Sequence, residues 1–251
     1  MSPPRAVAVI PARFASTRFP GKPLALIAGR PMIEHVWRRC QESRVFSEVL
    51  VATDDTRIQE TVERFGGRAV MTSPACATGT DRVAEVARQR PDVDVWVNVQ
   101  GDEPLLDPVA LQVLAGLFDD AAVRMGTLVR PLAEDEAANP NVVKAVLALN
   151  GEALYFSRGL VPHARDAGTS VKRWAHIGLY GYRRDVLLQL ATLPPTPLEE
   201  TEKLEQLRAL EHGIRIRCGQ VAWKTVAVDV PEDVEKVHAV LRQSPRPPGE
   251  G

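Results

Sequence analysis

Short valine-rich runs alternate with amphipathic stretches along most of this chain, and the alternation restricts the possible fold more than any other feature of the sequence. The runs at 5–10, 48–53, 93–99 and 125–130 are each suited to one buried strand. Because strands that alternate with helices form β-α-β units, the pattern predicts an α/β protein with a mostly parallel sheet and helices over both faces. The apolar residues at helical spacing between the runs are Met32, Ile33, Val36 and Trp37, then Ile58, Val62 and Phe65, then Val83, Val86 and Ala87.

The regular pattern stops after residue 149 and returns near residue 199. Arginines, histidines and aromatic residues gather at 150–182, which predicts a segment that faces a substrate. No repeat or change in composition marks a boundary, so residues 1–251 are predicted to form one domain. The later elements we expect are a helix at 199–212, a strand pair at 214–218 and 225–229, and a final helix with Pro231 in its first turn.

The charges of the chain are balanced, with 31 lysines and arginines against 32 aspartates and glutamates. A net charge of −1 provides no overall field that would attract nucleic acid or an anionic membrane, so we expect neither as a partner. Any anion must then be recognised by a local cluster. Three widely spaced cysteines without a CxxC pair, and the lack of a signal-like or long apolar segment, favour a soluble protein of the reducing cytoplasm.

Three cations stand in a loop directly after the first apolar run, in the stretch IPARFASTRFPGKPL. Arg13, Arg18 and Lys22 lie between prolines and a glycine that stiffen the backbone. One loop arginine is usually solvated, but a stiff segment with three cations loses less entropy when it binds an anion. The motif is not a P-loop, because a proline follows the lysine. Arginine forks and a lysine charge are therefore expected to hold phosphates at the carboxyl edge of the sheet.

Two aspartates end predicted strands without an obvious duty as helix caps. Asp102 follows the third run, where Asp107 and Pro108 already supply the cap and first turn of the next helix. Asp229 ends the last predicted strand, one residue too early to cap the final helix. Two carboxylates opposite a cationic loop suit Mg²⁺, a hard ion that keeps several waters and bridges to substrate phosphates.

Six motifs occur in order along the chain: PARFASTRFPGKPL, MTSPACATGTDR, VNVQGDEP, ALYFSRGLVP, HIGLYGYR and LEQLRALEHG. Together they closely resemble the 3-deoxy-manno-octulosonate cytidylyltransferase family over about residues 5–240. The resemblance implies a three-layer, Rossmann-like nucleotide-diphospho-sugar transferase fold and a homodimer, with sugar binding and dimerisation around 150–182. It also implies an enzyme that uses CTP, Mg²⁺ and the acid sugar 3-deoxy-D-manno-octulosonate (KDO) to make CMP-KDO and pyrophosphate for lipopolysaccharide assembly.

The resemblance assigns roles to residues by their place in these motifs. Asp102 and Asp229 fall on metal-binding positions. Arg13 and Lys22 fall on triphosphate-binding positions, with Arg18 as a helper. The catalytic set consists of Asp102, Asp229, Arg13 and Lys22. The remaining positions are Ala12, Thr72, Thr78, Gln100 and Gly101 for the nucleotide, and Arg158, His176, Tyr180, Glu205 and Gln206 for the sugar.

The sugar-binding set has suitable chemistry, because Arg158 can pair with the sugar's carboxylate and the others offer donors and acceptors to hydroxyl groups. Ordinary structural explanations exist as well: a lone histidine is often structural, the tyrosines can line the edge of a core, and Glu205 and Gln206 can face water. The segment VPHARD departs from the family pattern at His163 and Ala164. The substrate can therefore be KDO or a related acid sugar, such as its 8-amino derivative or a sialic acid.

From these assignments we expect the sugar's anomeric hydroxyl to attack the α-phosphorus of CTP while pyrophosphate leaves. The metal and the loop cations would stabilise the charge that develops on the phosphates. No side chain stands out as a general base. A glycosyltransferase and a non-catalytic nucleotide-binding module are the alternatives; the cationic loop favours a triphosphate over the first, and the paired acids favour catalysis over the second.

Overall fold

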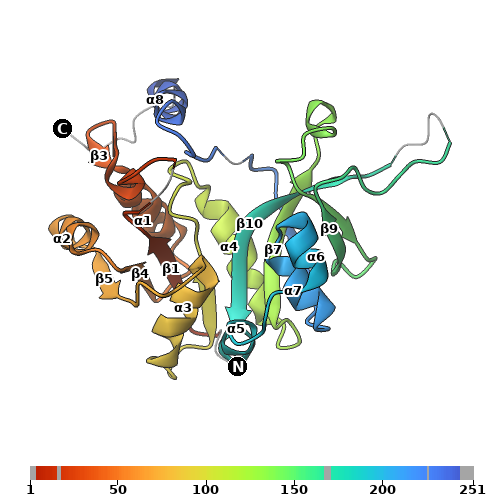
Figure 1. Cartoon of the computed structure of the whole chain (residues 1–251), viewed down its shortest axis with the longest axis horizontal. Coiled ribbons are helices and arrows are strands. Elements are labelled where there is room, and N and C mark those ends of the chain that lie inside the picture. Colours follow the sequence, from red (N-terminus) through yellow and green to blue (C-terminus); the bar gives the residue numbers. More distant parts are fainter. Residues whose placement is uncertain (1–3, 16–17, 167–170, 225, 244–251) are drawn as a thin grey trace.

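The computed structural model describes residues 4–15, 18–166, 171–224 and 226–243. Within them, nine strands form one sheet along the path β11-β7-β10-β6-β1-β4-β5, with β8 beside β10 and β9 beside β8 (Figure 1). On that path only β10 runs against its neighbours, so the predicted mostly parallel sheet is confirmed. The strands are β1 Ala6–Ala12, β4 Glu48–Thr53, β5 Arg68–Met71, β6 Val95–Asn98, β7 Met125–Pro131, β8 Lys144–Leu147, β9 Ala153–Ser157, β10 Trp174–Arg183 and β11 Ile216–Gln220, with a separate hairpin of β2 Leu26–Ile27 and β3 Arg30–Pro31.

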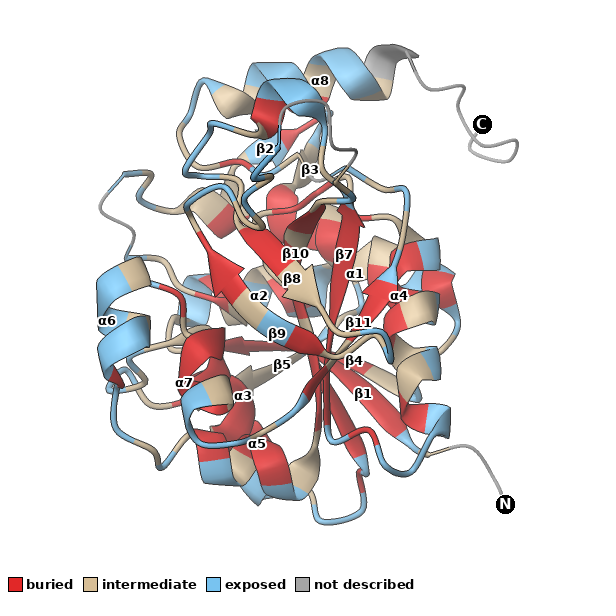
Figure 2. Ribbon diagram, turned by 90° about the vertical axis from the view of Figure 1, so that its right-hand side faces the viewer, coloured by how far each residue is buried: buried red, intermediate tan, exposed pale blue. Residues whose placement is uncertain are grey.

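Helices cover both faces of the sheet and give the three expected layers, with the buried residues concentrated in the strands between them (Figure 2). Val97 of β6 packs with α1 and α4 on one face, whereas Trp96 packs with α3, α5 and α7 on the other. None of the helices in the described residues is long and apolar enough to cross a membrane. The helices are α1 Met32–Ser43, α2 Thr56–Arg64, α3 Gly79–Arg88, α4 Pro108–Gly116, α5 Arg184–Leu190, α6 Pro197–Glu202, α7 Gln206–Glu211 and α8 Asp233–Gln243, with 3₁₀ turns η1 Lys22–Leu24, η2 Leu117–Asp119 and η3 Glu134–Glu136.

The long helix predicted at 199–212 is wrong, because two short helices, α6 and α7, occupy this segment. The break falls at Lys203, whose φ of 54° is left-handed and ends α6. Leu204 follows at once and is buried in the core with Leu207. The turn thus directs leucines of this segment into the sheet, which the helical spacing of the sequence does not reveal.

The predicted strand at 225–229 is also wrong for residues 226–229, while Thr225 lies outside the described residues. The amide of Val228 donates to the Asp102 carbonyl oxygen at 2.9 Å instead of joining the sheet. The final helix, α8, begins at Asp233, two residues after Pro231. The reason is local: the Asp233 carboxylate accepts from the amides of Asp229 and Val230, which holds the preceding residues in a turn.

Helix α8 lies beside the β2–β3 hairpin, far along the sequence but adjacent in space (Figure 1). The amide of Ala28 donates to His238 Nε2 at 3.0 Å, and Ile27 and Val237 share a small buried cluster. This packing fixes the C-terminal segment against the loop that follows β1. Asp229 is brought to the carboxyl edge of the sheet in this way.

Strand β1 lies between β4 and β6, and the chain leaves β1 toward β4 before it crosses to β6. Such a reversal in strand order opens a crevice at the carboxyl ends of the two strands, where ligands bind in open α/β sheets. Arg13 directly follows β1, and Gln100 to Asp102 come shortly after the end of β6 at Asn98. The topology therefore places the predicted phosphate loop and the first predicted metal ligand at one crevice.

Candidate active site

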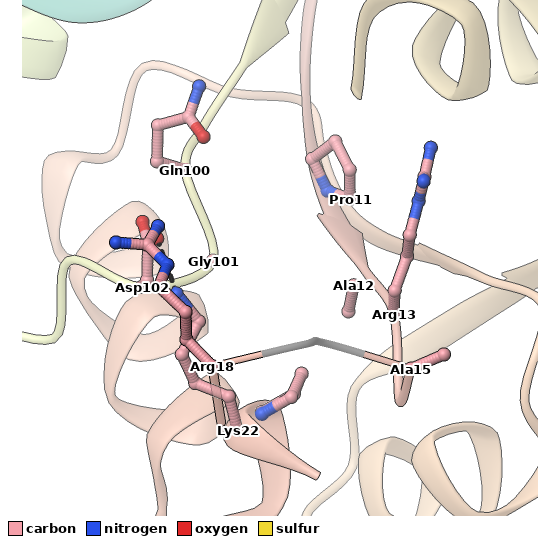
Figure 3. A pocket seen from close by; sticks show the side chains of 10 residues that line it. Pro11, Ala12, Arg13, Ala15, Arg18, Lys22, Gln100, Gly101 and Asp102 are labelled. Atoms are coloured by element: carbon pink, nitrogen blue, oxygen red, sulfur yellow. Dashed lines mark hydrogen bonds and ion pairs between the residues drawn. The ribbon is translucent and has the colours of Figure 1, made fainter. Parts of the chain in front are cut away.

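A pocket of about 420 Å³ occupies the crevice between β1 and β6 (Figure 3). Lys22, Arg18 and Asp102 gather on one side of it, while Arg13 extends from the other side. The predicted cationic loop and Asp102 do share one cavity. Its lining consists of Pro11, Ala12, Arg13, Ala15, Arg18, Lys22, Pro23, Gln100, Gly101 and Asp102.

The loop after β1 is closed by short-range contacts. Gly21 has a φ of 71°, a conformation that favours glycine, and its amide donates to the Phe14 carbonyl oxygen at 2.9 Å. The Phe14 ring lies under the Arg57 guanidinium, whose carbon is 3.3 Å from the ring centroid. A side chain at Gly21 would meet the same ring. The described part of the loop is therefore constrained at both ends.

Lys22 connects the two predicted metal ligands. Its ammonium donates to Asp102 Oδ2 at 2.7 Å and to the Val228 carbonyl oxygen at 3.0 Å, and lies 3.9 Å from Asp229 Oδ1. Arg18 Nη2 donates to the same Asp229 oxygen at 3.1 Å. The structure thus brings both carboxylates to one cation, although they come from opposite ends of the chain.

Neither aspartate caps a helix, in agreement with the sequence. Asp107 caps α4 by accepting from the Val109 amide at 2.9 Å, which leaves Asp102 free of that duty. Asp229 precedes α8 and uses its backbone amide, not its carboxylate, in the turn closed by Asp233. Lys236 and the two backbone amides lower the pKa of Asp233 to about 2, so this carboxylate stays charged and holds the turn at neutral pH.

The nucleotide-binding predictions fall into two groups. Ala12, Arg13, Gln100 and Gly101 line the crevice pocket. The Arg13 guanidinium also donates to the carbonyl oxygen of Cys76 and so connects the β1 loop to the segment before α3. At Gly101 a Cβ would lie 3.0 Å from the Pro11 carbonyl oxygen, tighter than most Cβ contacts, so glycine suits the close approach of these two segments.

Thr72 and Thr78 have structural duties and are absent from the pocket linings within the described residues. The Thr72 hydroxyl donates to the Thr53 carbonyl oxygen at 3.1 Å and accepts from buried Arg82. Thr78 begins α3 in a capping box with Asp81. Their proposed contacts with a nucleotide would have to compete with these hydrogen bonds.

A second pocket, of about 230 Å³, adjoins the first and contains three of the predicted sugar-binding residues. Among the described residues, Gln100 is the one that both linings share. Its Nε2 donates to the Gly178 carbonyl oxygen at 3.3 Å, where a bulge interrupts the pairing of β10 with β7. The lining consists of Gly79, Thr80, Asn98, Gln100, Met125, Tyr180, Tyr182, Leu190, Glu205 and Gln206.

Burial raises the pKa of two groups at this second pocket. Desolvation raises the pKa of Glu205, an effect that a hydrogen bond with the Thr80 hydroxyl partly offsets. Desolvation also raises the pKa of Tyr180 well above its ordinary value, so its hydroxyl stays a neutral donor and acceptor. Gln206 is 5% exposed, so the explanation that it simply faces water is wrong.

His176 lies next to this pocket and is held by its neighbours. Its ring packs edge-on against Phe156, with centroids 4.9 Å apart, and lies 5.4 Å from the Tyr180 ring. Nε2 is 2.9 Å from the Thr127 hydroxyl, which itself donates to the Leu179 carbonyl oxygen at 2.8 Å. Desolvation lowers the pKa of His176 to about 3, so the imidazole is neutral at ordinary pH.

Arg158 is not brought into either pocket lining within the described residues. Its guanidinium donates to the carbonyl oxygens of Glu202 at 2.7 Å, Pro140 at 3.0 Å and Lys203 at 3.4 Å. These carbonyls include the end of α6, where helical acceptors are otherwise unpaired. A carboxylate ligand would have to draw this arginine away from at least some of them.

The residues around Lys22 fit a magnesium ion by their chemistry. Two carboxylates converge on one positive charge, and their oxygens are hard donors of the kind that Mg²⁺ prefers. No group of three or more histidines, cysteines, aspartates or glutamates suited to a metal is found in the described residues. A site with two protein carboxylates leaves the other positions to water and phosphate oxygens, as is usual for this ion.

Three polar residues of the second pocket escaped the sequence reasoning: Asn98, Thr80 and Tyr182. A signal for Asn98 exists, because it is the polar residue of a buried valine-rich strand and stands two positions before Gln100. Side chains two residues apart in a strand share a face. The contribution of Thr80 depends on how α3 docks against the sheet, which no local pattern reports.

The crevice, its cationic loop, its paired carboxylates and the adjoining polar pocket define a nucleotidyltransferase of the α/β class. The family model described as cytidylyltransferase matches residues 7–216. The chain is 77% identical to a 3-deoxy-manno-octulosonate cytidylyltransferase of Myxococcus xanthus, covering 95% of this chain and 97% of that protein. The protein of the same name from Geobacter sulfurreducens is 53% identical, with 94% and 98% covered. The chain belongs to the cytidylyltransferase family and, within it, to the 3-deoxy-manno-octulosonate cytidylyltransferases.

Solved structures agree with this membership. A CMP:2-keto-3-deoxy-manno-octonic acid synthetase complexed with CTP superimposes with a TM-score of 0.91 at 44% identity, covering 95% of this chain and 99% of that chain. A 4-diphosphocytidyl-2C-methyl-D-erythritol synthase from Anaerococcus prevotii has a TM-score of 0.65 at 11% identity, covering 96% and 100%. The second likeness shows the fold alone. The expected nucleotide-diphospho-sugar transferase fold is confirmed.

Proposed function

We propose that this chain transfers the cytidylyl group of CTP to KDO, producing CMP-KDO and pyrophosphate for lipopolysaccharide assembly. The observation that carries the proposal is the meeting of two pockets at Gln100, one cationic and carboxylate-bearing, the other lined by tyrosine, threonine and carboxamide groups with the carboxyl group of Glu205. A triphosphate suits the first pocket and a polyhydroxylated sugar the second. The names of the relatives and the CTP in the structure of one of them supply the identities of the two substrates.

The arrangement supports direct transfer between the two substrates. With CTP in the crevice and the sugar beside it, the anomeric hydroxyl oxygen forms a bond to the α-phosphorus and loses its proton to water. The bond from that phosphorus to the β-phosphate bridge then breaks, and pyrophosphate leaves. Arg13 and Lys22, with Arg18 at the rim, would hold the β- and γ-phosphates, where charge develops during transfer.

Asp102 and Asp229 would hold Mg²⁺ when CTP is bound. The ion would supply positive charge next to the phosphates and help to orient them. Lys22 spans the two carboxylates at present and would turn toward the phosphates, leaving both acids for the metal. A neutral His176 and Tyr180 would contact the sugar, and Glu205 and Gln206 would bind its hydroxyls. Arg158 would pair with the sugar's carboxylate after leaving its backbone partners.

Pyrophosphate release from purified protein tests the proposal. CTP would be combined in turn with KDO, its 8-amino derivative and a sialic acid, each with and without Mg²⁺. We expect magnesium-dependent release that is fastest with KDO. Release that is faster with another acid sugar would assign that sugar as the substrate. A protein that binds CTP and releases no pyrophosphate with any of them would instead be a binding module, and the proposed activity would be wrong.

The proposal includes a homodimer in the cytoplasm, formed through the segment around 150–182. Support comes from exposed leucines on and beside the edge strand β9, because large apolar side chains on a surface often mark an interface. Leu154 is 61% exposed and Leu160 is 44% exposed. Light scattering of the protein and of Leu154→Glu tests this part: a wild-type dimer that the variant converts to a monomer is expected, and a monomeric wild type would contradict it.

A further inference from the structure

Strand β6 has one polar side chain, Asn98, and that side chain is 3% exposed. Alternation along the strand places Asn98 on the same side as Trp96 and opposite the core side of Val97. Across the sheet, Asn98 pairs in register with Tyr180 of β10. Both residues line the second pocket. Asn98 therefore belongs to the wall of this pocket and not to the apolar layer beneath it.

Two carboxamides of this pocket each have one atom without a hydrogen-bond partner in the described residues. Asn98 Oδ1 and Gln206 Nε2 are both buried and have no hydrogen-bond partner within the described residues. Buried polar groups are nearly always paired, so two exceptions in one small pocket require a reason. One of these atoms is an acceptor and the other a donor. This combination complements hydroxyl groups, which can both donate and accept.

The rest of the lining is consistent with a hydroxyl ligand. Tyr180 and Tyr182 contribute phenolic groups that burial keeps neutral, and Thr80 contributes a hydroxyl. The terminal torsion of a carboxamide has a broad energy profile. A ligand in the pocket can therefore draw the unpaired atom of Asn98 toward itself without moving the backbone of β6.

We propose that Asn98 is a specificity-determining residue of the second pocket, whose carboxamide oxygen accepts a hydrogen bond from a hydroxyl group of the acid sugar. Gln206 supplies the complementary donor. The proposal rests on the proposed function for the identity of the sugar. A site that pairs its buried polar groups only with substrate hydroxyls rejects analogues that lack them, because the groups are then left unpaired. Asn98 thus discriminates by hydroxylation pattern, whereas Arg158 was assigned to the carboxylate.

The near-isosteric variant Asn98→Leu tests the proposal by steady-state kinetics and thermal unfolding. We expect the KM for the sugar to rise about 10- to 100-fold with the KM for CTP unchanged. The Tm should stay the same or rise, because the variant removes a buried acceptor that has no partner. A purely structural Asn98 would give the opposite pattern, a lower Tm with an unchanged sugar KM, and that result would overturn the proposal.

Ser43→Ala provides the control. Ser43 is also buried, but its hydroxyl donates to the Cys40 carbonyl oxygen at 2.6 Å on the far side of the sheet. We expect this variant to have a lower Tm than the wild type and the wild-type KM for the sugar. The contrast separates the loss of a satisfied polar group from the loss of an unsatisfied one.

Monodeoxy analogues of the sugar identify the hydroxyl. The wild type should lose activity most at one position, and Asn98→Leu should show no further loss for that analogue. If each monodeoxy analogue lowers the activity of Asn98→Leu as much as it lowers the activity of the wild type, the proposal is wrong. Absence of pyrophosphate from CTP and KDO would count against the proposed function alone. The comparison would then use calorimetry with whichever acid sugar binds the wild type, and equal affinity of Asn98→Leu would overturn the role of Asn98.

Discussion

The Lys22 ammonium donates to Asp102 Oδ2 at 2.7 Å and lies 3.9 Å from Asp229 Oδ1, so one cation contacts both carboxylates of the proposed magnesium site. Lys22 is also the lysine proposed to bind the triphosphate. The same charge cannot serve the carboxylates and the phosphates equally well. Binding of CTP with its metal is therefore expected to exchange one set of partners for the other.

Replacing Lys22 by methionine should weaken CTP binding more than it affects the sugar. The variant loses a charge-assisted hydrogen bond to phosphate, so we expect kcat/KM for CTP to fall about 10- to 100-fold. Initial rates at varied CTP measure this effect. Arg39→Met removes an exposed cation of α1 that pairs with Glu42, and it should keep wild-type kinetics. An unchanged kcat/KM in the Lys22 variant would exclude the proposed triphosphate contact.

Replacing Asp102 by asparagine should reduce turnover with little loss of folding stability. The variant keeps the shape of the side chain but removes the negative charge of one of the two proposed metal ligands. We expect kcat to fall about 100-fold or more, as when other preorganised charge stabilisers are lost. Measurements at several Mg²⁺ concentrations would show the defect. Asp107→Asn is the matched control, because asparagine caps a helix as well as aspartate does. Wild-type turnover of the Asp102 variant at ordinary Mg²⁺ would contradict the metal role.

Arg158→Ala should affect stability as well as the sugar. The carbonyl oxygens of Glu202 and Pro140 lose a donor, so we expect the free energy of unfolding to fall by roughly 1–3 kcal/mol. The apparent KM for the sugar should rise, because the partner of its carboxylate is gone. Urea unfolding and sugar titration of the rate test the two effects separately. A loss of stability with an unchanged sugar KM would leave Arg158 a structural residue.

Acid should destabilise the protein through His176. Its pKa is about 3 in the folded chain against 6.5 for the free side chain, so the unfolded state takes up the proton first. The stability due to the neutral imidazole is complete above pH 6.5 and is lost as the pH falls toward 3. We expect this group to cost roughly 3 kcal/mol at pH 4 relative to pH 7.

Urea unfolding of His176→Gln at pH 7, 5.5 and 4 measures that contribution. The variant cannot take up this proton, so its stability should fall less with acid than that of the wild type. His212→Gln changes an exposed histidine and is the matched control for the substitution itself. If the free energy of unfolding changed equally with pH in the wild type and in the His176 variant, the imidazole would not be buried in its neutral form.

The sequence by itself determined the features that depend on neighbours along the chain. The valine runs predicted the strands, and the segment 48–53 coincides with β4. The capping pattern correctly predicted that Asp107, and not Asp102, is the N-cap of α4. These inferences succeeded because side-chain alternation, helical spacing and capping involve residues only a few positions apart. The same local reasoning failed at Lys203, where the long helix ends early.

Only the tertiary structure decided which distant groups meet. The approach of Asp229 to Asp102 depends on the docking of α8 against the β2–β3 hairpin, which no spacing in the sequence reports. The backbone partners of Arg158 and the unpaired carboxamide of Asn98 are likewise products of packing. Long-range contacts are set by the path of the whole chain. For that reason the sequence could name candidate residues, while their distances, partners and burial required the folded molecule.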